Sequence, residues 1–89
     1  MQPVGSVAAF VARYGARAAA DPAAAEILDT LDAEARLVVD AQAQPLAERR
    51  AWLSARSGTA WAEARLSHVE ERAFVQLRRE LQRRGFWQP

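Results

Sequence analysis

EARLSHVEERAFVQLRRELQRRG, residues 63–85, is the stretch that decides the fold class of this chain. Five of its apolar residues fall on one arc of a helical wheel, at about 100° per residue: Leu66, Val69, Ala73, Leu77 and Leu81. Such a stripe is typical of an amphipathic helix that packs its apolar side into a core. We therefore expect one long helix over residues 59–84, with Thr59 at its N-cap and Gly85 after its last turn.

Polar side chains of the same stretch form a second stripe, on a neighbouring arc about 80° wide. Its members are Arg65, His68, Arg72, Gln76, Arg79 and Arg83. The stripe is either a solvated surface, stabilised by pairs such as Glu80 with Arg84, or a surface that binds a partner. Trp61 precedes the helix and is the best single candidate for a contact with that partner, with packing on the preceding helix as the alternative.

The rest of the chain also has the composition of helices. Ala, Leu, Arg, Glu and Gln dominate, and no segment alternates apolar and polar residues as a strand does. The capping residues Ser6, Asp21 and Asp32 and the helix-ending residues Pro45 and Gly58 divide this part into four expected helices. These helices cover residues 6–19, 22–31, 33–43 and 46–56. We expect an all-α single domain over residues 1–89, a small bundle of four to five helices.

Apolar residues in these four segments are the expected core. They are Val7, Phe10, Val11, Tyr14, Ile27, Leu28, Leu31, Leu37, Val38, Val39, Leu46, Ala47, Trp52 and Leu53. The apolar tail, Phe86 and Trp87, is expected to fold back onto this core. The alternative is an exposed aromatic pair that forms a contact site.

Charge is divided unevenly along a chain whose net charge is +1. Residues 1–44 hold three arginines and six acidic residues, a net charge of −3. Residues 45–89 hold nine arginines and five glutamates, a net charge of +4. A basic half can indicate a surface that faces nucleic acid. The glutamates among these arginines make the signal weaker than that of a typical basic DNA-binding domain.

The sequence lacks the residue patterns of common enzyme and metal sites. It has no cysteine, one histidine (His68) and no glycine-rich phosphate loop, and no serine has a base paired with it. We therefore expect no enzymatic activity, no metal and no cofactor. The chain shows no signal peptide and no apolar run of about 20 residues, so we expect a cytoplasmic protein that does not enter the membrane.

Two segments resemble region 4 of the sigma-70 family of transcription factors, over residues 27–84. LDTLDAEARLVV, residues 28–39, is similar to the start of that domain: a Leu-x-x-Leu segment, a capping residue, a Glu, an Arg and two apolar residues. RLSHVEERAFVQLRREL, residues 65–81, resembles its recognition helix and the continuation of that helix. The residues that carry the second match are Arg65, Leu66, Val69, Glu70, Arg72, Ala73, Leu77 and Arg78.

The resemblance implies a helix-turn-helix variant that places its second helix in the major groove of DNA, and docking on RNA polymerase. It places Arg65, His68 and Arg72 near the groove or the phosphate backbone. The first hypothesis is therefore a small bacterial or phage transcription regulator that binds DNA, RNA polymerase or both. It acts through Arg65, His68, Arg72 and Arg79, with Gln76 on the same arc.

The sequence also departs from the family pattern. Arg49 and Arg50 stand where the family's support helix has an acidic, an apolar and a small residue. Glu63, Ala64 and Ser67 stand where the family has its base-reading residues. These departures support a second hypothesis, a non-enzymatic inhibitor or adaptor of phage or mobile-element type. It would bind a host protein through Trp61, Arg65, Arg72 and the tail, and homodimerisation is open in either case.

Overall fold

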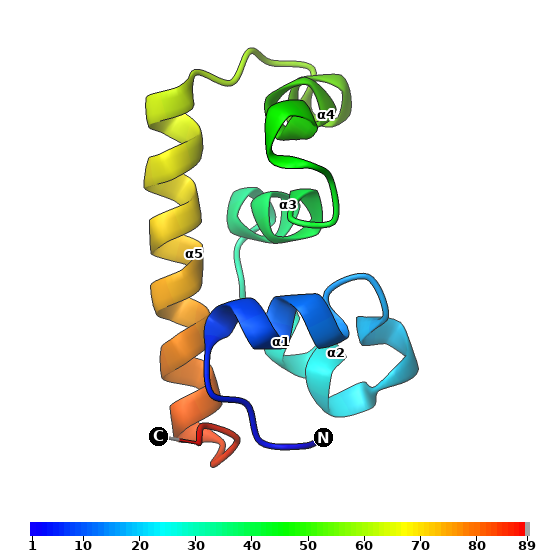
Figure 1. Ribbon diagram of the computed structural model, residues 1–89, viewed down its shortest axis with the longest axis vertical. Helices are drawn as coiled ribbons and strands as arrows, with labels where there is room; N and C mark the ends of the chain where they lie inside the picture. The colour runs from blue at the N-terminus through cyan, green and yellow to red at the C-terminus, as the bar shows by residue number, and fades with distance from the viewer. Residues whose placement is uncertain (89) are drawn as a thin grey trace.

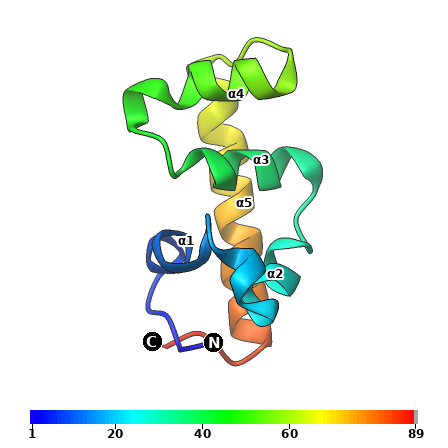
Figure 2. The same cartoon turned by 90° about the vertical axis from the view of Figure 1, so that its right-hand side faces the viewer.

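A computed structural model describes residues 1–88 of the chain, and Pro89 lies outside the described residues (Figure 1). In chain order the elements are α1 (Val7–Tyr14), the 3-10 helix η1 (Ala18–Ala20), α2 (Pro22–Leu28), α3 (Ala33–Ala41), the 3-10 helix η2 (Leu46–Glu48), α4 (Arg49–Ser57) and α5 (Glu63–Arg83). The expected all-α fold with a long C-terminal helix is confirmed. Figures 1 and 2 show α5 as a straight rod, with the other helices stacked along one of its sides.

Three of the expected capping residues start helices. Ser6, Asp21 and Asp32 each accept hydrogen bonds from backbone N–H groups two or three residues further on, at 2.9–3.3 Å. These bonds satisfy donors that have no partner inside the helix, which is why the helices begin at these residues. Gly58 ends α4 in the left-handed conformation, with a φ of 73°, as expected.

Several expected helix boundaries are wrong. The first helix ends at Tyr14 rather than at residue 19, and the Ala-rich segment after it forms only the short turn η1. Asp21 precedes a proline and is extended, so the chain cannot run helically into α2. The segment expected as helix 46–56 is divided into η2 and α4.

The long helix begins at Glu63, not at Thr59. Residues 58–62 form a linker between α4 and α5, and Ala62 takes the N-cap position without a side-chain hydrogen bond. The reason is tertiary: the linker places the side chain of Trp61 in the core, where it is 3% exposed. Thr59 therefore does not act as the cap of this helix.

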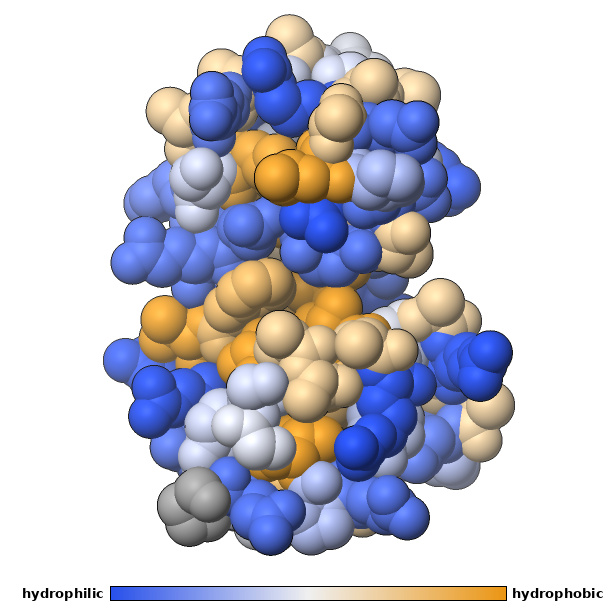
Figure 3. Space-filling model, viewed as in Figure 1, coloured by the Kyte–Doolittle hydropathy of each residue, from blue (hydrophilic) through white to orange (hydrophobic). Residues whose placement is uncertain are grey.

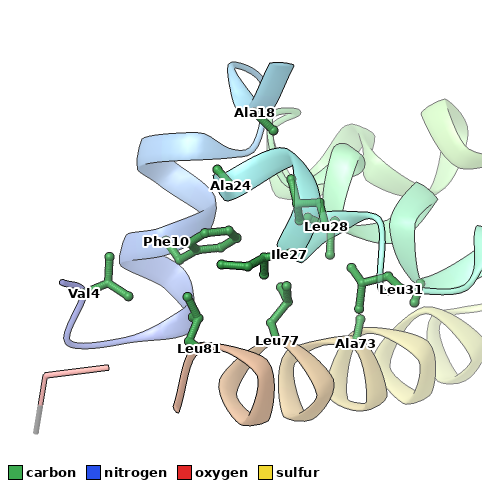
Figure 4. Close-up of a cluster of buried hydrophobic side chains, with 12 residues drawn as sticks. Val4, Phe10, Ala18, Ala24, Ile27, Leu28, Leu31, Ala73, Leu77 and Leu81 are labelled. Carbon is green, nitrogen blue, oxygen red and sulfur yellow. The ribbon is translucent and has the colours of Figure 1, made fainter. Parts of the chain in front are cut away.

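The core consists of two clusters of apolar side chains that share α5. The first cluster contains Val4, Phe10, Ala18, Ala24, Ile27, Leu28, Leu31, Ala35, Val39, Ala73, Leu77 and Leu81 (Figure 4). The second contains Val38, Ala41, Leu53, Trp61, Leu66 and Val69. The predicted core face of α5 is confirmed, because its five residues are all buried. No helix within residues 1–88 has the combination of length and apolar character that a membrane span requires.

Leu46 and Ala47 were expected in the core, and both are exposed. The side chain of Leu46 is 73% exposed, because η2 precedes α4 as a separate turn and lies off its buried side. The tail does fold back as expected. The backbone N–H of Val4 donates to the Phe86 carbonyl at 2.9 Å, and Gln88 donates to the Val4 carbonyl at 2.8 Å. Phe86 and Trp87 thereby pack against the first cluster.

Candidate functional site

The polar stripe lies along one flank of α5, beside the residues that face the core. The helix is continuous over its 21 residues, so the helical period keeps the stripe together. Five of the six predicted site residues lie on this flank: Arg65, His68, Arg72, Gln76 and Arg79. His68, Arg72 and Arg79 are exposed, and Arg65 and Gln76 are half-buried.

Two arginines of the stripe are paired with carboxylates at the start of α3. Arg65 Nη2 lies 3.0 Å from Glu34 Oε2. Arg72 Nη2 lies 3.2 Å from both Asp32 Oδ1 and Glu34 Oε1. The four side chains are 38–46% exposed, so each pair contributes only about 0–1 kcal/mol to stability. Their main effect is on the charge of the surface, because carboxylates of the same chain balance the positive charges of Arg65 and Arg72.

Trp61 is part of the core and not of the surface. It shares the second cluster with Leu53, and its Nε1 donates to Ser57 Oγ at 3.0 Å. The Arg65 guanidinium covers the ring, with its carbon 3.9 Å from the ring centroid. Arg50 Nε donates to the Trp61 carbonyl at 2.8 Å. The structure thus places Trp61 in its packing alternative, and the predicted contact of Trp61 with a partner does not fit this position.

A shallow hollow of about 420 Å³ lies on the outer side of α5. Its lining residues are His68, Glu71, Arg72, Val75, Gln76 and Arg79. The side chain of Val75 is 43% exposed. Gln76 Oε1 is buried and has no hydrogen-bond donor among residues 1–88. The hollow therefore combines an exposed apolar group with charges of both signs.

Glu71 and Val75 were not among the site residues predicted from the sequence. Val75 could have been found from the helical wheel, because it is an apolar residue among polar ones on the side opposite the buried leucines. Both residues also line a second hollow of about 520 Å³, which reaches Phe74 and Trp87. The guanidinium carbon of Arg78 lies 5.3 Å from the centroid of the Trp87 ring. Val75 thus stands between two shallow depressions on the outer surface of the helix.

No protein-family model, curated protein or solved structure matches this chain. Within residues 1–88, no three His, Cys, Asp or Glu residues lie close enough to share a metal ion.

A further groove, of about 300 Å³, lies between α1 and α3. Small and apolar residues line most of it, among them Ala8, Val11, Ala12, Val39 and Phe74. Figure 3 shows apolar residues in a band across the middle of this face of the molecule. The groove contains none of the predicted site residues.

An ion-pair cluster lies at the C-terminal end of the stripe. Glu80 pairs with both Arg83 and Arg84, and Arg84 Nη1 also lies 3.0 Å from Glu26 Oε1 of α2. Hydrogen bonds from Arg83 and from Arg84 lower the pKa of Glu80 from 4.5 to about 2. Arg83 therefore stabilises the C-terminal turn of α5, and the cluster joins that turn to α2.

We expect Glu80→Gln to destabilise the protein at pH 7 and to have only a small effect near pH 2. The carboxylate has a lower pKa in the folded chain than in the unfolded one, so its stabilisation is complete above about pH 4.5. The stabilisation is lost as pH falls through the folded pKa of about 2. Urea unfolding of both proteins at several pH values measures the difference. Glu48→Gln is the control, since Glu48 is exposed and forms no ion pair among residues 1–88. A difference that is independent of pH would contradict the role of Glu80.

Proposed function

We propose that this chain is a non-enzymatic protein-binding domain that contacts its partner through the outer side of α5. The observation that carries the proposal is the hollow around Val75. Protein interfaces commonly have an apolar centre surrounded by a polar rim. Val75 supplies an apolar centre, and His68, Glu71 and Arg79 supply a rim of both charge signs.

The charges of the stripe also favour a protein over a phosphate backbone. Binding to DNA depends on arginines that neutralise phosphates. Arg65 and Arg72 lie within 3.2 Å of carboxylates of α3. These carboxylates would repel a phosphate that approached either arginine. Glu63, exposed in the first turn of α5, acts in the same direction. A protein partner of mixed charge meets no such penalty.

A second candidate function is transcription regulation by a sigma region 4-like helix-turn-helix that binds DNA, RNA polymerase or both. Its support is that α3, α4 and α5 enclose one cluster of buried side chains, with Gly58 turning the chain after α4. Arg50 and Arg56 are exposed on α4 and could face phosphates. One feature departs from this motif: the linker of residues 58–62 is longer than the usual helix-turn-helix turn of three or four residues. RNA polymerase as the partner would agree with both candidates.

One capture experiment separates the candidates. The tagged chain is incubated with an extract of the organism that carries the gene, and the captured material is analysed for protein and for nucleic acid. We expect one protein to be captured, and Val75→Arg to reduce the captured amount by at least about tenfold, because a charge replaces the apolar centre. Leu46→Arg is the matched control, since Leu46 is also exposed but lies on η2. Capture of nucleic acid alone, weakened by salt, would support the second candidate and reject the first.

A further inference from the structure

The outer side of α5 carries a ridge with opposite charges at equal distances from its central residue. Glu71, Val75 and Arg79 follow one another at intervals of four residues, the spacing that forms a continuous ridge on a helix. All three are exposed. The other helices pack on one side of α5, and Figures 1 and 2 show no helix on its outer side.

A groove of matching direction lies beside this ridge. The hollow of about 420 Å³ is bounded by the ridge and by the next row of the helix, His68, Arg72 and Gln76. Helices pack when the ridge of one enters the groove of the other. A ridge and an adjacent groove on the same surface allow two identical helices to satisfy this condition mutually. Such self-complementarity is what an isologous interface requires.

The geometry points to a homodimer in which two α5 helices pair in antiparallel orientation about a two-fold axis at Val75. In this arrangement Glu71 of each copy faces Arg79 of the other, because both lie four residues from the axis. Neither residue forms an ion pair within residues 1–88, so both charges are available. A parallel pair would place each Glu71 opposite another Glu71, which is repulsive. The order of the charges therefore selects the antiparallel pair.

The same pairing accounts for a further feature of the surface. It buries Val75, whose side chain is 43% exposed in the single chain, against its counterpart. A helix of 21 residues is about 31 Å long. One helix pair of this length gives a small interface, so we expect a dissociation constant of about 1–100 µM.

This inference deepens the proposed function, since it names a second copy of the chain as an occupant of the α5 surface. Sedimentation velocity of the purified full chain, from about 5 to 500 µM, tests it. We expect a monomer–dimer equilibrium that shifts with concentration. Glu71→Arg and Arg79→Glu each place like charges opposite one another twice, and each should weaken the dimer by at least about tenfold. Circular dichroism confirms that both variants remain helical.

An equimolar mixture of the two variants is the decisive measurement. In the mixed dimer every substituted side chain meets the opposite charge, so dimerisation should return to the wild-type level. A chain that stays monomeric at all concentrations, single variants that dimerise normally, or a mixture that is not restored would each overturn the inference. This test needs no other protein. A monomer that still captures a partner in a Val75-dependent manner would reject the homodimer and retain the proposed function, and a restored mixed dimer without any captured partner would do the reverse.

Discussion

Leu77→Ala should lower the free energy of unfolding by about 2–5 kcal/mol, the range for a fully buried leucine. Leu77 has no exposed surface and belongs to the first cluster. Figure 4 shows it pointing from α5 towards Ile27 of α2, with Phe10 of α1 nearby. The truncated side chain would leave a cavity among three helices, in addition to the loss of buried apolar surface. A domain of this size has a total stability of only about 4–13 kcal/mol, so the loss is a large part of it.

Urea unfolding followed by circular dichroism measures this loss, and the chain offers a control with the same chemistry. Leu46→Ala removes the same atoms from a side chain that is 73% exposed, and its effect should stay within about 0.5 kcal/mol. Equal effects of the two substitutions would mean that Leu77 does not occupy a packed core, and the described packing of α5 on α2 would be wrong.

Features that depend on a few neighbouring residues were predictable from the sequence. The buried face of α5 follows from the helical period alone, and the caps at Ser6, Asp21 and Asp32 act within one turn. The positive φ angles of Gly58 and Gly85 likewise reflect a local requirement that glycine meets most easily. Each of these signals lies within one continuous segment of the chain.

Features that depend on distant contacts were not predictable in this way. Residues 58–62 would be compatible with a helix by composition, but burial of Trp61 in the second cluster draws them into a linker. The sequence pattern placed Leu46 in the core, but Leu46 is exposed because η2 forms a separate turn before α4. Such boundaries depend on the packing of α3, α4 and α5 together.

The candidate site shows the same division. The helical period correctly placed the stripe residues on one flank of α5. It could not reveal that Arg65 and Arg72 pair with Glu34 and Asp32, which are 31 to 40 residues away in the chain. These pairs remove much of the basic character that the stripe has in the sequence. An exposed valine on the same helix then becomes the more informative residue.

Trp61→Ala should also destabilise the protein strongly, by about 3–5 kcal/mol. Its ring fills the space between α4 and the start of α5, and it is 3% exposed. The substitution removes the hydrogen bond to Ser57 and the surface on which the Arg65 guanidinium lies. The linker of residues 58–62 would lose its only large buried side chain, so α4 should separate from α5 before the first cluster unfolds. Hydrogen exchange of the α4 amides, compared with those of α2, measures this order.

Two further variants divide the effect of Trp61 into its parts. Ser57→Ala removes the hydrogen-bond acceptor of the indole N–H, together with the hydrogen bonds between Ser57 Oγ and Thr59, and should cost about 0.5–1.5 kcal/mol. Trp61→Phe keeps an aromatic ring in the cluster and should lie between Ser57→Ala and Trp61→Ala in stability. If Trp61→Ala instead kept wild-type stability and lost only partner binding, Trp61 would be a surface contact after all. The position of the linker, and with it the start of α5 at Glu63, would then be wrong.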